Sequence, residues 1–513
     1  MPAHATLLPQ PYPAAVSDLA TAQALFTSAV QAHERGDLAA AECGYRAALR
    51  HAPDRPSIVA NLATVLFQLG HFAASRELCL DVLERQPGAA ALWVRLGNAQ
   101  SRLQQAEEAL QSYQRALAID SDDVEALTNT AHLLEAEGRM AEALTHLDRV
   151  LAITPDHAEA RNNRGNVLAD LDRFDEALAD YRRAQTAAPQ AALACWNEAL
   201  CRLHTGDFAG GWPLYHHGWA AGQRGQAPAF TQKQWDGSEH ADTLLVWGEQ
   251  GIGDQILFST LLDDLGNRVR QLVVALDARL LPLYRRSFPS MQFISLRDAP
   301  GFAGASHHIA IGDLGRQLRN DAGAFHPQSG GFLRADAART AALRGSLGGG
   351  QLRLCGLSWS SSNPRLGRFK SLGDADLSAL AALPGVRWVD LQYGNTHDER
   401  QQMRERWGLD LVHVDAIDNF RDTDGFAALV AACDQVVSVS NTTVHVAGAL
   451  GVPVQVMLPR TAGRIWYWHH GRSDSPWYAS VRLLRQQTLG DWRPVIEAVA
   501  AELSKTLDRM EAK

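Results

Sequence analysis

The feature that most constrains this chain is a repeat of 34 residues that runs through its first two fifths. Three kinds of residue recur in that register: Asn61, Asn129, Asn163 and Asn197; Gly36, Gly70, Gly138 and Gly206; and Pro53, Pro87, Pro155 and Pro189. At position 95, where the spacing predicts an asparagine, the residue is Arg95. A fixed period of this length is typical of stacked helix–turn–helix units, each of which buries its apolar face only against its neighbours.

The register divides this part of the chain into five full repeats and an interrupted sixth. The repeats span 22–55, 56–89, 90–123, 124–157 and 158–191, and the sixth begins at Ala192. Small residues where helices cross alternate with large ones, as at Gly97 and Tyr113, so that paired helices interlock. We therefore predict an α-solenoid of tetratricopeptide repeats (TPR) over 22–220, preceded by an N-terminal tail at 1–21.

The first helix of each repeat is expected to face a concave groove lined with asparagines. An asparagine amide offers both a donor and an acceptor, so a ladder of them can pair with the backbone of an extended peptide. In this the array resembles the TPR domain of O-linked N-acetylglucosamine transferases, whose asparagine ladder holds protein substrates. The resemblance implies that an acceptor protein or peptide binds Asn61, Asn98, Asn129, Asn163, Asn166 and Asn197. The alternative is that these asparagines merely follow the TPR consensus, which favours asparagine at these positions.

The sixth repeat is interrupted at 206–212, after which aromatic residues gather. Trp212, Tyr215 and Trp219 are expected to cap the exposed end of the array and to dock it on the next domain, as terminal repeats must be covered. The polar stretch 221–240, with its glycines and prolines, is predicted to be a linker.

After Ala241 apolar, β-rich runs alternate with helical stretches, which predicts parallel sheets covered by helices. The predicted strands are 243–247, 271–275, 292–295, 353–359, 386–391, 435–439 and 453–458. A glycine-rich segment at 345–350 divides them. The expected fold class is thus an α-solenoid followed by α/β: two Rossmann-like lobes, at 241–348 and 349–505, with a cleft at the carboxyl ends of their strands.

The first candidate site is the turn Gly248–Gly253 with Asp254, which joins the first strand to a helix. Glycines permit a tight turn and close approach by a ligand. Asp254 is either a general base facing the cleft or a cap of the helix N-terminus, and the two roles are compatible.

Two further turns carry hydroxyl, amide and cationic side chains. The first holds Ser440, Asn441, Thr442, Thr443 and His445 at a helix N-terminus, a cradle for a phosphate group. The second runs from Ser358 through Ser360 to Arg365, Arg368 and Lys370, and its hydroxyls and cations suit a diphosphate. The alternative for the second turn is a solvated basic loop. Gln392, at the end of another strand, is expected near the base or ribose of a nucleotide.

These motifs make the second half resemble GT-B glycosyltransferases, and within them the heptosyltransferase-like family nine. That family has a Gly-Asp at the first turn, matched by Gly253 and Asp254, with the aspartate as catalytic base. It also has an Asp-Thr-Gly-x-x-His turn that holds the donor's diphosphate. Here Ser440 and Thr442 replace its aspartate and glycine, while His445 matches its histidine. The resemblance covers about 241–490, and its combination with a TPR array is similar to bacterial TPR-fused glycosyltransferases.

The resemblance implies transfer of a sugar from a nucleotide-sugar without a bound metal or other cofactor, and with inversion. Asp254 would take the acceptor's proton, and Lys370 would stabilise the charge developing on the leaving group. Gly253, Ser360, Gln392, Ser440, Asn441, Thr442, Thr443 and His445 would bind the donor. Intact Asp254, Lys370 and His445 favour an active enzyme.

Three functions are compatible with the sequence. The first is a protein O-glycosyltransferase acting on Ser or Thr, with a bacterial surface protein such as flagellin as an acceptor suggested by the resemblance. The second is a glycan or lipid-linked-sugar transferase that uses its repeats for recruitment. The third is a non-catalytic scaffold with a degenerate GT-B module. The asparagine ladder favours the first.

Composition narrows the partners and the expected location. A net charge of −9 argues against nucleic-acid binding, which needs a basic field. No stretch approaches the ~20 apolar residues of a membrane span. The N-terminus lacks the pattern of a signal peptide, and the six cysteines form no CxxC pair, so a cytoplasmic protein with reduced thiols is expected.

Overall fold

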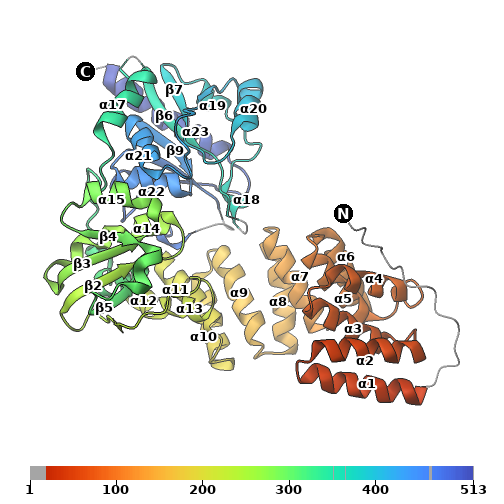
Figure 1. Cartoon of the computed structure of the whole chain (residues 1–513). Helices are drawn as coiled ribbons and strands as arrows, with labels where there is room; N and C mark the ends of the chain where they lie inside the picture. The colour runs from red at the N-terminus through yellow and green to blue at the C-terminus, as the bar shows by residue number, and fades with distance from the viewer. Residues whose placement is uncertain (1–18, 351, 364–365, 461–464, 512–513) are drawn as a thin grey trace, which may run out of the picture. The chain divides into compact units, whose positions relative to one another are not determined.

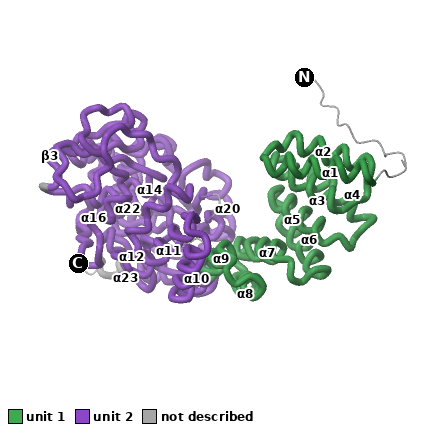
Figure 2. The backbone as a smooth tube through the Cα atoms, turned by 90° about the horizontal axis from the view of Figure 1, so that it is seen from below, with its two compact units in different colours: residues 1–167 green, residues 168–513 purple. Residues whose placement is uncertain are grey.

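The computed structural model describes residues 19–350, 352–363, 366–460 and 465–511. It divides into two compact units, up to Val167 and from Leu168 onward (Figure 2). The first unit holds most of the repeats. The second begins within the fifth repeat and holds the remaining repeat helices together with two parallel sheets. The predicted tail falls largely on residues outside the described part of the chain.

The repeats are pairs of antiparallel helices joined by short turns (Figure 1). The repeat helices are α1 (Leu19–Glu34), α2 (Leu38–His51), α3 (Pro56–Gln68), α4 (Phe72–Leu83), α5 (Ala90–Arg102), α6 (Ala106–Ile119), α7 (Val124–Ala136), α8 (Met140–Ile153), α9 (Ala158–Asp170), α10 (Phe174–Ala187), α11 (Ala192–Thr205) and α12 (Phe208–Tyr215). Interlocking of small and large residues is confirmed at Gly97, where an added Cβ would lie 2.5 Å from the ring of Tyr113.

The turn within each helix pair explains the glycine register. Gly36, Gly70, Gly138 and Gly206 adopt φ between +78° and +86°, the left-handed conformation that glycine reaches without steric cost. The two repeats without a glycine use Gln104 and Asp172 at the equivalent positions, with φ of 63° and 62°. The 34-residue register therefore continues through repeats in which the glycine signal is missing.

Two parallel sheets form the core of the second unit. The first has the order β1-β5-β2-β3-β4, with β1 (Lys233–Gln234), β2 (Ala241–Trp247), β3 (Val269–Leu276), β4 (Gln292–Ser295) and β5 (His307–Ala310). The second has the order β11-β10-β9-β6-β7-β8, with β6 (Arg353–Ser358), β7 (Val386–Asp390), β8 (Leu411–Val412), β9 (Gln435–Val439), β10 (Val454–Leu458) and β11 (Val481–Arg485). The central strands are nearly continuous apolar runs, as strands covered on both faces require.

Helices connect and cover these strands. They are α13 (His217–Ala220), α14 (Ile252–Phe258), α15 (Leu281–Ser287), α16 (Leu314–Leu318), α17 (Ala337–Ser346), α18 (Gly367–Lys370), α19 (Ser378–Ala381), α20 (His397–Trp407), α21 (Thr423–Ala432), α22 (Thr442–Ala449) and α23 (Arg493–Glu511). The two lobes meet where α14 packs on α22, and a bidentate ion pair of Arg286 with Asp424 (2.7 and 2.8 Å) joins them.

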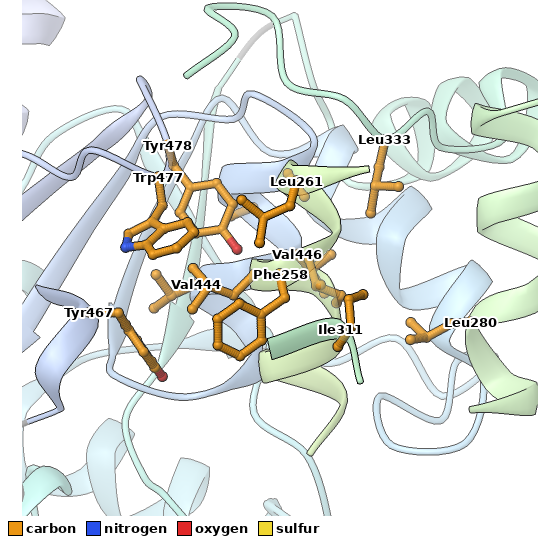
Figure 3. Close-up of a cluster of buried hydrophobic side chains, with 14 of the residues drawn as sticks. Phe258, Leu261, Leu280, Ile311, Leu333, Val444, Val446, Tyr467, Trp477 and Tyr478 are labelled. Carbon is orange, nitrogen blue, oxygen red and sulfur yellow. The ribbon is translucent and has the colours of Figure 1, made fainter. Parts of the chain in front are cut away.

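The predicted docking of the last repeat helix is seen at Trp212. Its indole nitrogen donates to the carbonyl of Arg319 (2.7 Å), and an added Cβ at Gly315 would lie 2.4 Å from its ring. Trp212 and Tyr215 belong to the same buried cluster as the strands of the first lobe, part of which Figure 3 draws. The end of the array is thereby covered by apolar packing.

The stretch predicted as a linker is more structured than its composition indicates. It contains the edge strand β1 and the buried Arg224, whose Nε donates to Glu249 (2.6 Å) and whose Nη1 donates to Asp313 (2.6 Å). The guanidinium also lies 4.2 Å from the centre of the Trp219 ring. The sequence of this polar segment predicts a loop, because no local feature indicates that Arg224 forms an ion pair with a carboxylate 25 residues away.

Candidate functional site

A cavity of about 640 Å³ lies between the two lobes of the second unit. It opens beyond the carboxyl ends of β2, β6, β7 and β9, where ligands bind in sheets of this kind. Most of the residues predicted for catalysis and donor binding line it: Gly253, Asp254, Lys370, Ser440, Asn441, Thr442, Thr443 and His445. Ser360 and Gln392 are not among the lining residues, and Arg365 lies outside the described part of the chain.

Asp254 both caps a helix and faces the cavity. It follows the turn after β2, and its Oδ2 accepts a hydrogen bond from the backbone N–H of Gly251 (3.2 Å) at the start of α14. Burial raises the pKa of this carboxyl to about 6, an effect that the Gly251 N–H and the charge of Lys370 only partly offset. A carboxyl of that pKa is suited to general base catalysis near neutral pH.

Lys370 ends the short helix α18 and is only 4% exposed. Burial lowers the pKa of its ammonium to about 8, although Asp254 favours the charged form. No described residue forms an ion pair with this ammonium within 4.0 Å, and no described side chain or carbonyl accepts a hydrogen bond from it. A buried cation without such a partner is costly, so its position in a cavity wall indicates an anionic ligand.

Asn441 organises the turn between β9 and α22. Its Oδ1 accepts from the backbone N–H of Thr443 (3.0 Å), and its Nδ2 donates to Ser358 Oγ (2.7 Å) and to the carbonyl of Ser360 (3.0 Å). The amide is thus used in joining two strand ends. Thr442, by contrast, is partly exposed in the first turn of α22 and lines the cavity.

Gln392 supports the site from behind. Its Oε1 accepts from Ser358 Oγ and from the backbone N–H groups of Trp359 and Ser360, at 2.9 to 3.0 Å. The side chain is 2% exposed. Gln392 and Ser360 therefore stabilise the loop after β6 through these hydrogen bonds. They do not lie at the cavity surface, where the sequence predicts that they contact the donor.

His445 also differs from the expectation. Its Nδ1 lies 3.1 Å from the hydroxyl of Tyr478, its Nε2 lies 3.1 Å from that of Tyr467, and its ring stacks on Trp468. Burial lowers the pKa of the imidazole to about 3. Both nitrogens are engaged, so the prediction that His445 donates to a phosphate oxygen does not fit this geometry. Gly253 makes room for it, since an added Cβ would lie 2.9 Å from the ring.

Sequence reasoning missed much of the cavity wall. Tyr467, Asn419, Phe420 and Arg279 line it, as do Trp196 and Leu200 from the repeat helix α11. Arg279 lies over the Phe420 ring, 4.8 Å from its centre, and donates to its carbonyl (3.1 Å). These residues come from loops and from a repeat, and no local motif marks them. The 57% exposed fraction of Phe420, unusual for its type, appears only in the folded chain.

Two rungs of the predicted asparagine ladder, Asn98 and Asn129, belong to one hydrogen-bond network that joins neighbouring repeats. Asn98 donates to Glu125 (2.9 Å) and accepts from Tyr113 and Asn129, each at 2.8 Å. Arg95, the residue that interrupts the ladder, pairs with the same Glu125. A peptide must displace this network to reach Asn98 and Asn129.

The remaining rungs lie in different surroundings. Asn61 donates to the carbonyl of Ser57 (2.9 Å) in its own helix, and Asn163 accepts from Asn162 (3.2 Å). Asn166 lies with them in the first unit, whereas Asn197 lies in the second. All are partly exposed.

The described residues contain neither a membrane-spanning helix nor a cluster of metal ligands. No helix among them is long and apolar enough to span a membrane. Within the same residues, no group of three or more His, Cys, Asp or Glu side chains is placed to hold a metal ion.

Comparisons with known proteins match the repeats and, in one case, most of the chain. Tetratricopeptide repeat models match residues 15–155, 128–192 and 163–210, and the N-terminal region is thus a TPR array. Protein FlbA of Caulobacter vibrioides is 28% identical over 476 residues, which cover 88% of this chain and 73% of FlbA.

Solved structures of repeat proteins are also similar to this region. A TPR protein of Thermus thermophilus is 23% identical, with a TM-score of 0.32, and the match covers 36% of this chain and 99% of that one. A TPR protein of Parabacteroides merdae is 17% identical, with a TM-score of 0.33, covering 41% and 82%.

Proposed function

We propose that this protein is a glycosyltransferase of GT-B architecture that moves a sugar from a nucleotide-sugar to a Ser or Thr hydroxyl of a protein held by the repeats. The observation that carries the proposal is the buried ammonium of Lys370, which lines the cavity without an ion-pair partner among the described residues. The anionic phosphate of a donor bound in this cavity would neutralise the ammonium, and the cavity lies where doubly wound sheets bind nucleotides.

A second observation supports transfer and not mere binding. Asp254 lines the same cavity with a carboxyl whose pKa is raised to about 6, so that it is ionised at neutral pH yet basic enough to accept a proton. Base and cation are electrostatically coupled, since the charge of each shifts the pKa of the other. Titratable pairs shifted by burial in one cavity are typical of catalytic sites.

In the proposed reaction the acceptor oxygen forms a bond to the anomeric carbon while the bond from that carbon to the phosphate oxygen breaks. The acceptor's proton goes to Asp254, and the electron pair of the broken bond stays on the phosphate. Lys370 stabilises the negative charge that develops on the phosphate, as a divalent ion does in other transferases. A single displacement of this kind inverts the anomeric centre. No metal or other cofactor is part of the proposal.

The repeats supply the proposed acceptor site, because TPR arrays usually bind proteins. Within the ladder, a peptide that binds Asn98 and Asn129 must displace their hydrogen bonds in the Arg95–Glu125 network. Two residues of the repeat helix α11, Trp196 and Leu200, line the same cavity as the proposed catalytic groups.

A non-catalytic scaffold is the second candidate. It is favoured by the engagement of Asn441 and His445 in the fold, which leaves two of the residues expected to contact the donor without free polar groups. On this alternative the second unit only presents the repeats to partners.

The test is a binding and transfer experiment on the full chain in the presence of EDTA. Thermal shift against nucleoside mono- and diphosphates of each base and against their sugars identifies a donor, because a ligand at 100 times its Kd adds about 2.7 kcal/mol of stability. The donor found is then assayed for transfer to candidate proteins by intact mass. Wild-type transfer that is lost in Asp254→Asn supports the proposal. The scaffold takes its place if no nucleotide compound binds, or if one binds and no sugar is transferred to any protein that the repeats retain.

A further inference from the structure

The hydroxyl of Tyr467 is held by His445, a residue whose position in the sequence predicts phosphate binding. Tyr467 lines the cavity, is 6% exposed, and contacts His445 Nε2 at 3.1 Å. Asp254 lines the same cavity, and its charge contributes to raising the pKa of this phenol. Figure 3 shows Tyr467 and Tyr478 among the side chains packed around Val444 of α22.

A neutral imidazole has one donor nitrogen and one acceptor nitrogen, so the two tyrosines must use opposite senses. In one tautomer Nε2–H donates to Tyr467, and the hydroxyl of Tyr478 donates to Nδ1. In the other, Tyr467 donates to Nε2, and Nδ1–H donates to Tyr478. The choice decides where the hydroxyl proton of Tyr467 points.

The surroundings of Tyr478 select between the tautomers. Tyr478 is 2% exposed, and among the described residues its hydroxyl has no hydrogen-bond partner other than His445. In the second tautomer its proton would be buried without an acceptor, which disfavours that tautomer by roughly tenfold or more. In the first tautomer every group on this side is satisfied.

The surroundings of Tyr467 are compatible with the first tautomer. The indole nitrogen of Trp468 donates to Ser440 Oγ (2.8 Å), so the hydroxyl proton of Ser440 must be directed elsewhere. No hydrogen bond within 3.5 Å joins Ser440 to Tyr467 among the described residues. In the Nε2–H tautomer the oxygen of Tyr467 accepts from His445, so its own proton is left for an acceptor in the cavity.

We propose that Tyr467 is a substrate-binding residue whose hydroxyl, oriented by the Nε2–H tautomer of His445, donates to an oxygen of the sugar beside Asp254. His445, with Tyr478 behind it, is a positioning residue. The proposal rests on the proposed function for the identity of the ligand. It concerns the transferred sugar, because Tyr467 lines the same cavity as Asp254, the proposed base, and the phosphate is assigned to Lys370.

The tautomer is tested on the full chain without any ligand. Nuclear magnetic resonance of protein labelled with ¹⁵N in the histidine rings distinguishes protonated from unprotonated ring nitrogens, and the signal missing from His445→Gln identifies the residue. We expect neutral His445 with a protonated Nε2 from about pH 6 to about pH 8, since the pKa of the ring is far below that range. A protonated Nδ1, or a charged ring, overturns the proposal whatever the catalytic activity is.

The contact is tested with the donor identified by the binding screen. Tyr467→Phe should weaken binding of the nucleotide-sugar by about 3- to 10-fold and leave binding of the corresponding free nucleotide unchanged. Tyr478→Phe is the matched control: it removes the same atom from the other side of His445, but Tyr478 does not line the cavity, so its effect should be smaller.

The outcomes separate this inference from the proposed function. Equal losses for sugar and free nucleotide in Tyr467→Phe, or no loss at all, overturn the inference while nucleotide binding by the wild type still stands. Absence of any nucleotide or sugar binding by the wild type overturns both.

Discussion

Replacing Lys370 by methionine should make the protein more stable and remove its donor binding. The ammonium is buried, and its pKa is lowered from 10.5 to about 8, which means that folding disfavours its charged form. At about 1.4 kcal/mol for each pKa unit, the cost at pH 7 is about 3 kcal/mol. Methionine has a similar length and no charge, so Lys370→Met should recover most of that free energy.

The gain should depend on pH in a direction opposite to that of an ordinary paired lysine. The folded-state pKa is below the unfolded value, so the unfolded chain binds more protons between about pH 8 and 10.5. The penalty on the wild type is complete below the folded-state pKa, and it fades as the pH rises toward 10.5. The stability difference between Lys370→Met and the wild type should therefore be largest at or below about pH 7 and should shrink above about pH 8.

Differential scanning calorimetry is the suitable assay, because a chain with two compact units need not unfold in a single transition. We expect the transition of the second unit to rise by about 5 °C at pH 7. Lys505→Met is the matched control, since it removes an exposed lysine of α23 that does not line the cavity and should change neither stability nor binding appreciably. Lower stability of Lys370→Met at pH 7 would refute the reasoning, because it would mean that the ammonium has a stabilising role within the fold.

The remaining predictions concern the proposed base, the pH profile and the join between repeats and sheets. Asp254→Asn should lower turnover by roughly 10²- to 10⁴-fold in a transfer assay while the nucleotide affinity is kept, since asparagine can still accept from Gly251. Wild-type kcat/KM should fall below about pH 6 as Asp254 protonates and above about pH 8 as Lys370 loses its charge; a profile flat from about pH 5 to 9 would contradict both assignments. Arg224→Met should destabilise the second unit by about 3–5 kcal/mol, as it leaves Glu249 buried without its partner; denaturation monitored by tryptophan fluorescence measures the loss, and a change below about 1 kcal/mol would show that the pair is dispensable.

The repeat architecture could be predicted from the sequence because its signals are local and periodic. Every repeat contributes the same helix pair. Gln104 and Asp172, which replace the glycine in two repeats, adopt the same left-handed backbone conformation as the glycines at the equivalent positions. The central strands are predictable for a related reason, since β2, β9 and β10 are nearly continuous apolar runs. The edge strands β1, β8 and β11 escape prediction, as does β5 beside β1, because these strands are short or carry charged and histidine side chains that only their neighbours in the sheet justify.

The site is predicted less completely, and the errors have a common cause. Asp254, Lys370 and Thr442 line the cavity, as expected from turns that follow strands. Gln392 and His445 stand at equally suggestive positions, yet their polar atoms face inward and bond to other parts of the fold. Sequence identifies which residues follow a strand, but the direction of a side chain depends on partners such as Tyr467 and Tyr478, which lie 22 and 33 residues away from His445.

The relation between Asp254 and Lys370 explains how one cavity can hold both a base and an anion site. Had the two formed a close ion pair, attraction would have lowered the pKa of the carboxyl and raised that of the ammonium, and each would have neutralised the other. Instead no ion pair within 4.0 Å joins them, and burial moves their pKa values toward one another, to about 6 and about 8. At pH 7 both are charged, and both remain available. Both line one cavity, so a ligand bound there could meet the proposed base and the proposed cation separately, as transfer from a phosphate ester requires.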